Sequence, residues 1–251
     1  MGRKHAILLL FGLCCLSLQA GATPRLRACV DEYPPQQRLH PKAEGENIAA
    51  LEALSQLLSL DLVLVEGPNF ARCLLMLDRG EVDVVPGIIP SEERARQYLL
   101  LPFRHDSRYV FVSHKGLQPL LRYEDLYGKP IAVSRNTLYF SRFDKDPALQ
   151  KEQVGSLNTA IRMLLAERIQ LVIVPEVNLG GLRSQFEDFD RLLQVNPLRI
   201  GEDRIIQFGF SRFHGLGLSE QTLRDKVETA FAAGVFEDAI REFIDTHPHW
   251  Y

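Results

Sequence analysis

Long hydrophobic runs are scarce in this sequence of 251 residues. The longest, residues 6–18, is too short to cross a membrane as a helix, which takes roughly 20 apolar residues. It follows two basic residues and precedes an Ala-Gly-Ala sequence at residues 20–22, the order of charged, apolar and small segments in a secretory signal peptide. We therefore predict that residues 1–22 are a cleaved signal peptide and that the chain is exported.

The sequence also has no excess of basic residues, a feature that is relevant to whether the protein binds nucleic acid. The chain has 29 Lys and Arg residues against 32 Asp and Glu residues, a formal net charge of −3 at pH 7. Cleavage of the signal peptide removes Arg3 and Lys4, so the net charge becomes −5. Nucleic-acid-binding domains usually carry a basic patch, and we predict no nucleic-acid partner. The 229 residues after the signal peptide suffice for one large or two small domains.

Cysteine is rare, with four residues in the chain, and two of them leave with the signal peptide. Cys29 and Cys73 remain, the first in a predicted strand and the second in a predicted helix. In an oxidising compartment they form either a disulfide or two buried thiols, and the sequence leaves both alternatives open. The Cys-x-x-Cys spacing of metal sites is absent. We predict neither a metal nor a cofactor.

The first part of the remaining chain alternates short apolar runs with segments of helical periodicity. Apolar runs at residues 26–30, 62–65 and 82–85 predict strands, and the spacing of apolar residues over 48–60 and 70–77 predicts helices between them. We expect the third strand to stop at Pro86-Gly87, since proline cannot donate a ladder hydrogen bond. Strands and helices that alternate at this spacing indicate an α/β domain with parallel strands covered by helices.

The same alternation begins again after residue 113, which indicates a second lobe. Further strands and helices are predicted at residues 131–133, 157–166, 169–174, 204–210 and 218–244. We predict that residues 23–113 and 206–251 form the first lobe and that residues 114–205 form the second. Ligands of open α/β sheets bind beyond the carboxyl ends of the strands, so two facing lobes would enclose a cleft.

A possible carboxylate site follows the strand at residues 82–85. Ser91 stands three residues before Arg94, as in an N-cap, so the amides at the start of a helix and the Arg94 guanidinium would point to one spot. Arginine binds a carboxylate with two parallel hydrogen bonds. The alternative is that the charged residues at 92–96 form a solvated helix face.

This stretch resembles the periplasmic solute-binding proteins of family 3, the polar amino acid binders of ABC importers. Their Asp-Ala-Val, Thr-x-x-Arg and Phe-Ser-x-Pro-Tyr motifs correspond to residues 83–85, 91–94 and 99–103 here. The resemblance implies the type 2 periplasmic binding fold, in which each of two lobes is a mostly parallel sheet flanked by helices and two strands form the hinge. It also implies a monomer in the periplasm that captures a solute and delivers it to the permease of an ABC importer.

The resemblance further implies roles for individual residues. Arg94 would bind the carboxylate of the ligand with help from the Ser91 hydroxyl. Tyr33 stands in a turn where the family places an aromatic ring over its ligand. We expect Thr137 to lie at the start of a helix in the second lobe, where it would hold the other carboxylate oxygen.

One departure from the family concerns the ammonium group of an amino acid ligand. The family places an Asp after the strand at residues 169–174, whereas Pro175 stands there in this chain and Glu176 follows. Glu176 is therefore the candidate for the ammonium contact. We predict a ligand that is a small carboxylate, with α-amino acids as the leading subclass.

Two other functions stay open. Some relatives in this family are enzymes of the cyclohexadienyl dehydratase type, for which Glu176 or Glu32 would be the acid. The same lobes also occur as ligand-sensing domains that feed a separate receptor. Our prediction is a binding protein without catalytic activity.

Overall fold

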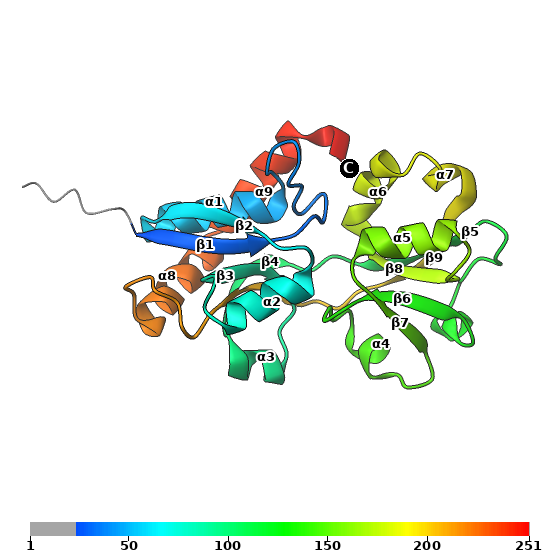
Figure 1. Ribbon diagram of the computed structural model, residues 1–251, viewed down its shortest axis with the longest axis horizontal. Helices are drawn as coiled ribbons and strands as arrows, with labels where there is room; N and C mark the ends of the chain where they lie inside the picture. Colours follow the sequence, from blue (N-terminus) through cyan, green and yellow to red (C-terminus); the bar gives the residue numbers. More distant parts are fainter. Residues whose placement is uncertain (1–23, 251) are drawn as a thin grey trace, which may run out of the picture.

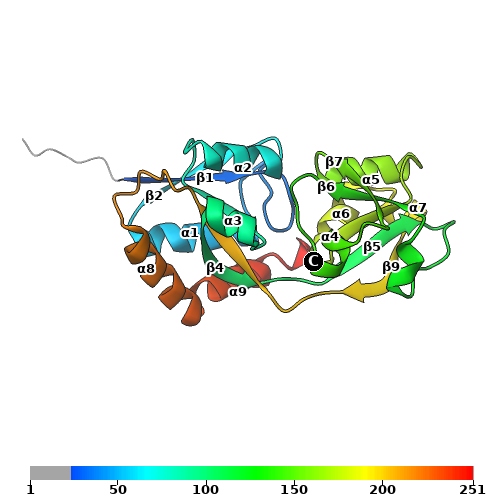
Figure 2. The same cartoon turned by 90° about the horizontal axis from the view of Figure 1, so that it is seen from below.

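The computed structural model describes residues 24–250, so the predicted signal peptide lies outside the described residues. Figure 1 shows two lobes side by side, joined by two extended connections that Figure 2 shows from below. In the part of the chain that is described, no helix combines the length and the apolar character that a membrane crossing requires.

The first lobe contains a five-stranded sheet in the order β2-β1-β3-β10-β4. Its strands are β1 (Arg25–Val30), β2 (Asp61–Glu66), β3 (Val84–Ile88), β4 (Leu99–His105) and β10 (Ile205–Phe210). Its helices are α1 (Glu46–Leu58), α2 (Phe70–Asp78), α3 (Glu92–Gln97), α8 (Glu220–Ala232) and α9 (Val235–Thr246), with a 3-10 turn η3 (Pro248–Trp250) at the end.

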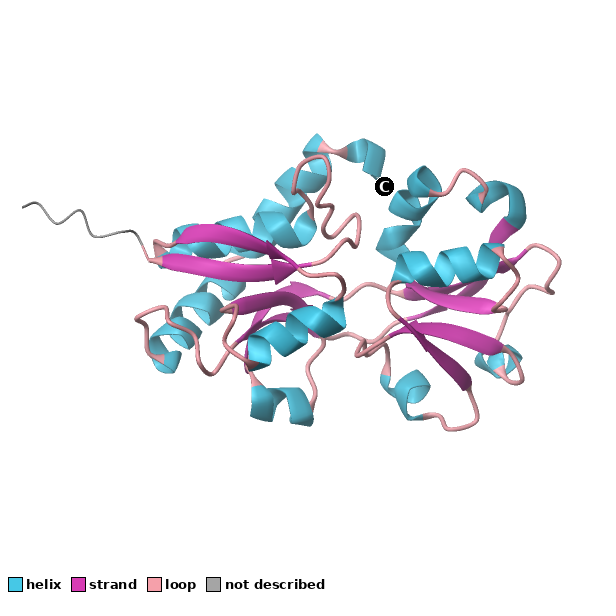
Figure 3. Ribbon diagram, viewed as in Figure 1, coloured by secondary structure: helices cyan, strands magenta, loops and turns pink. Residues whose placement is uncertain are grey.

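The second lobe repeats this arrangement with a five-stranded sheet in the order β7-β6-β8-β5-β9. Its strands are β5 (Tyr109–His114), β6 (Pro130–Ser134), β7 (Gln150–Val154), β8 (Leu171–Pro175) and β9 (Leu193–Ile200). Its helical segments are η1 (Tyr123–Leu126), α4 (Ser141–Lys145), α5 (Leu157–Leu165), η2 (Glu176–Asn178), α6 (Leu179–Gln185) and α7 (Phe189–Leu192). Figure 3 shows helices on both faces of each sheet.

The direction of the strands follows from the way in which the chain crosses between the lobes. Four strands of each described sheet run in one direction, and one strand, β10 in the first lobe and β5 in the second, runs against them. Each reversed strand enters its lobe directly from the other lobe. It therefore starts at the end of the sheet where the parallel strands finish. The mostly parallel sheets and the hinge of two connections agree with the prediction.

The connections lie at residues 106–108, between β4 and β5, and at residues 201–204, between β9 and β10. β5 pairs with β8 and β9 in the second sheet, so the first crossing precedes residue 113, where we placed the end of the first segment of lobe one. The second crossing ends at β10, whose first residue is Ile205.

Strand β3 does not stop at Pro86-Gly87 as expected, because it continues to Ile88. Its pairing with β10 explains this difference. Val85 lies opposite Gly209 and Ile88 lies opposite Gln207, so three steps along β3 match two along β10. The extra residue makes a β-bulge, in which Gly87 has a φ of 84°. A bulge tolerates proline, since its residues leave the regular ladder.

Alternate side chains of β1 enter two different cores. Leu26, Ala28 and Val30 pack into the core beneath α1, α8 and α9, while Cys29 points to the opposite face with α2. There Cys29 forms a disulfide with Cys73, with Cα atoms 5.4 Å apart. Of the two alternatives that the sequence leaves open, the structure has the disulfide. It fastens the start of α2 to β1.

Candidate functional site

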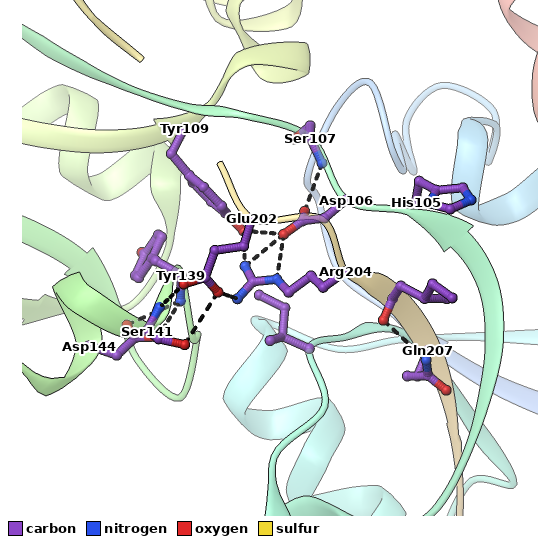
Figure 4. Close-up of polar contacts among 12 residues, drawn as sticks. His105, Asp106, Ser107, Tyr109, Tyr139, Ser141, Asp144, Glu202, Arg204 and Gln207 are labelled. Atoms are coloured by element: carbon purple, nitrogen blue, oxygen red, sulfur yellow. Dashed lines mark hydrogen bonds and ion pairs between the residues drawn. The ribbon is translucent and has the colours of Figure 1, made fainter. Parts of the chain in front are cut away.

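The two hinge connections are fastened to each other by a buried ion pair. Arg204 Nε donates to Asp106 Oδ2 at 2.7 Å, and Arg204 Nη2 donates to the Tyr109 hydroxyl at 3.1 Å (Figure 4). The backbone N–H of Asp106 also donates to the Arg204 carbonyl at 2.9 Å. The two charged side chains are only 4% (Asp106) and 15% (Arg204) exposed. The pair thus lies at the pivot between the lobes.

A cavity of about 90 Å³ lies between the lobes, beside this hinge. It offers room for several water molecules or a small solute. Both lobes and the hinge contribute polar side chains to its wall, among them Asp31, Tyr33, Asn47, Arg104, Asp106, Ser134, Thr137 and Ser156. Several of these residues follow strands, in the place where open α/β sheets bind their ligands.

An open groove adjoins this cavity and shares Ser134 and Thr137 with it. Helix α3 and the loop before it line the groove on the first lobe with Ser91 and Arg94. The loop after β6 lines it on the second lobe with Asn136.

A chain of hydrogen bonds in the first lobe ends at the cavity. Gln37 Nε2 donates to Asp31 Oδ1 at 2.7 Å, and Asn47 Nδ2 donates to Gln37 Oε1 at 3.2 Å. All three side chains are buried and line the cavity. Burial raises the pKa of Asp31 to about 6, although the hydrogen bonds from Gln37 and from the Phe70 backbone oppose the shift.

Two polar atoms of the cavity wall are buried and have no hydrogen-bond partner among the described residues. They are Asn47 Oδ1, an acceptor, and Arg104 Nε, a donor. A buried polar atom without a partner is costly, so such atoms are usually satisfied by water or by a ligand. Burial also raises the pKa of Tyr33 well above its ordinary value, so that its hydroxyl stays protonated. The wall of the cavity therefore presents one unpaired acceptor, Asn47 Oδ1, and one unpaired donor, Arg104 Nε.

The lobes touch across the cavity in this structure. Asn178, the last residue of η2 in the second lobe, donates to Gln36 Oε1 at 2.7 Å and to the Pro34 carbonyl at 2.6 Å. Tyr33 of the first lobe packs on the core of the second, and Leu138 of the second packs on the core of the first. The structure is thus a closed arrangement of the lobes.

The predicted site residues fall into three places. Tyr33 and Thr137 line the cavity. Thr137 does not start a helix as expected, because it lies in a turn after β6, where its backbone N–H donates to the Ser134 carbonyl at 3.1 Å, and α4 begins only at Ser141. Ser91 and Arg94 line the groove, and Ser91 Oγ accepts a hydrogen bond from the Arg94 backbone N–H at 3.2 Å, which is the N-cap that the sequence predicts. Arg94 is 8% exposed, so it does not belong to a solvated helix face.

Glu176 stands apart from this group. It begins η2 and forms an ion pair with Arg199 at 2.7 Å, and it does not line the cavity, whereas Pro175 does. Glu32, the other acid considered for an enzyme, accepts a hydrogen bond from the Leu39 backbone at 2.8 Å and does not line the cavity either.

Several residues of the cavity wall, chiefly Asn47 and Arg104, are not among those predicted from the sequence. A signal exists for both. Arg104 comes directly after the motif at residues 99–103, and Asn47 comes directly before the predicted helix at residues 48–60.

No family model matches the sequence, and no curated protein matches it. Solved structures do resemble the fold. The substrate-binding protein of an amino acid ABC transporter is 18% identical, with a TM-score of 0.70 over 90% of this chain and 98% of that chain. A Salmonella typhimurium periplasmic binding protein with high arginine specificity is 15% identical, with a TM-score of 0.72 over 90% of this chain and 99% of that chain.

A histidine kinase sensor domain with similarity to periplasmic binding proteins is also similar. It is 18% identical, with a TM-score of 0.71 over 88% of this chain and 96% of that chain. At these identities the likeness concerns the fold. The chain has the two-lobed fold of the periplasmic binding proteins, as the sequence predicts.

Proposed function

We propose that this protein is a periplasmic solute-binding protein for a small carboxylate-bearing solute, an amino acid or a related organic acid. The observation that carries the proposal is the cavity between the lobes, whose wall combines polar groups from both lobes with a buried donor and a buried acceptor that lack partners. In this proposal the chain is exported, acts as a monomer and delivers its ligand to the permease of an ABC importer.

The mechanism would be closure of the lobes around the ligand. A ligand that contacts Tyr33 on one lobe and Thr137 on the other gains both sets of contacts only in the closed state, so it shifts the population toward closure. The contacts of Asn178 with Gln36 and Pro34 add to the stability of that state. The permease would recognise the closed form.

Three of the predicted ligand contacts lie outside the cavity wall. Ser91 and Arg94 line the groove, which meets the cavity at Thr137. The proposal therefore includes a ligand whose carboxylate lies at this junction. Glu176 would first have to leave Arg199 before it could contact an ammonium group.

A sensing domain that feeds a separate receptor is the second candidate, and the similarity to a histidine kinase sensor domain favours it. The fate of the ligand distinguishes both candidates from a dehydratase-like enzyme, because a binding protein returns its ligand unchanged.

The test is a thermal-shift screen of the protein expressed from the full chain against amino acids, dicarboxylates, hydroxy acids and aromatic acids. A ligand at about 100 times its dissociation constant stabilises the folded state by roughly 2.7 kcal/mol, which moves the melting temperature measurably. Each ligand that raises the melting temperature is recovered from the protein, and its mass is determined by mass spectrometry. We expect a carboxylate that is recovered intact; a converted compound would favour the enzyme, and a panel without any hit would contradict solute binding.

A further inference from the structure

Two arginines of the first lobe face the space between the lobes, and they differ in what already binds them. Arg94 donates from Nη1 to the Ile89 carbonyl at 2.9 Å and from Nη2 to the carbonyl of Asn136. Ile89 belongs to its own lobe, whereas Asn136 belongs to the other. Arg94 thus takes part in a contact that holds the closed lobes together.

Arg104 is less occupied. Its Nε is buried without a partner in the described part of the chain, and its hydrogen bond through Nη1 goes to the carbonyl of its neighbour His105 at 3.2 Å. It lines the cavity, and its charge acts on the hydroxyl groups of Tyr33 and Tyr109 there. The guanidinium group therefore offers donors to an occupant of the cavity.

The two positions differ in the balance of contacts that an anion would make. A carboxylate that binds Arg94 would share a guanidinium that already donates to two carbonyls, one of them, Asn136, in the other lobe. A carboxylate that binds Arg104 satisfies a buried donor, and no contact of the closed state is broken. The unpaired buried donor on the wall of the cavity is therefore that of Arg104, whereas Arg94 is already engaged in a contact between the lobes.

The acceptor in the cavity has an orientation that the neighbouring residues determine. Asp31 accepts the amide N–H of Gln37, which turns the Gln37 oxygen toward Asn47. That oxygen accepts the amide N–H of Asn47, which leaves Asn47 Oδ1 without a partner. Asn47 is only 4% exposed, so its oxygen depends on a donor inside the cavity.

We infer that the ligand places its anionic group on Arg104 and a hydrogen-bond donor, an N–H or O–H group, on Asn47 Oδ1, while Arg94 binds the second lobe through Asn136. This assignment rests on the proposed solute binding and names the residues that select the ligand. A dicarboxylate without a donor group satisfies Arg104 but leaves the Asn47 acceptor unpaired, so amino acids and hydroxy acids bind better.

The experiment repeats the ligand screen with Arg104→Met, Arg104→Lys, Arg94→Met and Asn47→Leu. Arg191→Met is the matched control, because it removes one positive charge from an exposed pair on α7. Dissociation constants for each hit are measured by calorimetry, and circular dichroism establishes that each variant is folded. The probes are the 20 standard amino acids, succinate, glutarate, lactate and malate.

We expect Arg104→Met to weaken the hit by about 10- to 100-fold, the effect of one charged hydrogen bond, and Arg104→Lys to weaken it less. Arg94→Met should weaken it less than Arg104→Met, and Arg191→Met should leave it unchanged. Asn47→Leu should weaken amino acids or hydroxy acids more than the matched dicarboxylates.

Two results would overturn the assignment without touching solute binding, and a third would overturn both. If Arg94→Met abolishes binding of a wild-type hit while Arg104→Met retains it, the anion lies at Arg94. If the wild-type protein prefers succinate or glutarate to every compound that carries a donor group, the role of Asn47 is wrong. If the wild-type protein has no hit at all, the proposed function fails, and this assignment fails with it.

Discussion

Substitution of Arg204 by Met tests the view that the hinge depends on a buried ion pair. The Asp106 carboxylate is 4% exposed and forms an ion pair with Arg204 Nη2 at 2.6 Å. It accepts hydrogen bonds from Arg204 Nε at 2.7 Å and from the Ser107 backbone N–H at 2.8 Å. Arg204→Met removes the cation and leaves this carboxylate buried at neutral pH. The remaining partners, the Ser107 amide and the Tyr109 hydroxyl at 3.4 Å, do not neutralise its charge.

The expected loss of stability is large for a single substitution. Removal of one member of a buried ion pair costs about 3–5 kcal/mol, because the other charge stays desolvated. The double variant Arg204→Met with Asp106→Asn has no such charge, so it should be less destabilised than Arg204→Met alone. A coupling free energy of about 1.5 kcal/mol or more between the two positions follows.

The assay is urea unfolding of the wild-type protein, both single variants and the double variant, analysed as a double-mutant cycle. Arg224→Met is the control, since Arg224 pairs with Glu228 at 3.1 Å on the surface and should cost at most about 0.5 kcal/mol. The reasoning is refuted if the two substitutions are additive within about 0.5 kcal/mol, or if Arg204→Met costs no more than Arg224→Met.

Two further predictions concern the first lobe. The Cys29–Cys73 disulfide joins residues that are 44 apart in the sequence, so replacement of both by Ala should lower the free energy of unfolding by about 4 kcal/mol through the entropy of the unfolded chain. An unfolding midpoint that is the same with and without the bond would contradict this. Burial raises the pKa of Asp31 to about 6, so its contribution to stability is complete below the ordinary pKa of an Asp and is lost as pH rises through 6. Relative to Asp31→Asn, the wild-type protein should therefore gain up to about 3 kcal/mol of stability when pH falls from 7 to 4, and parallel stability curves for the two proteins would rule out this role.

Local patterns in the sequence were sufficient for much of the fold. The alternation of apolar runs and helical periodicity reflects contacts within each element, and it located β1, α1, β2 and α2 to within a few residues. The spacing of Ser91 and Arg94 predicted the N-cap of α3, because a cap depends on neighbours in the chain.

The end of β3 was predicted wrongly for a reason that lies elsewhere in the chain. Pro86 and Gly87 stop a regular strand, yet they are accommodated here by a bulge opposite β10, whose sequence position is more than a hundred residues away. The pairing that makes the bulge is invisible in the residues around Pro86.

In the candidate site, too, some features depend on neighbours in the chain and others on contacts between distant segments. The expected location of the site follows from the sequence, because strands of an α/β sheet carry ligand-binding residues after their carboxyl ends. Tyr33 and Thr137 line the cavity between the lobes. Which arginine faces the cavity does not follow from the sequence. Arg94 and Arg104 both come after strand β3 and near the cleft, and the Asn136 carbonyl that binds Arg94 arrives from the other lobe.

The sequence by itself thus determined the α/β class, the two lobes and the edge of each sheet where a ligand would bind, since these depend on periodicity and on order along the chain. The tertiary structure decided the Cys29–Cys73 bond, the hinge pair and the partners of Arg94, Arg104 and Glu176. Each of these depends on the distance between side chains from separate strands or lobes, and that distance is set only when the sheets and the hinge have formed.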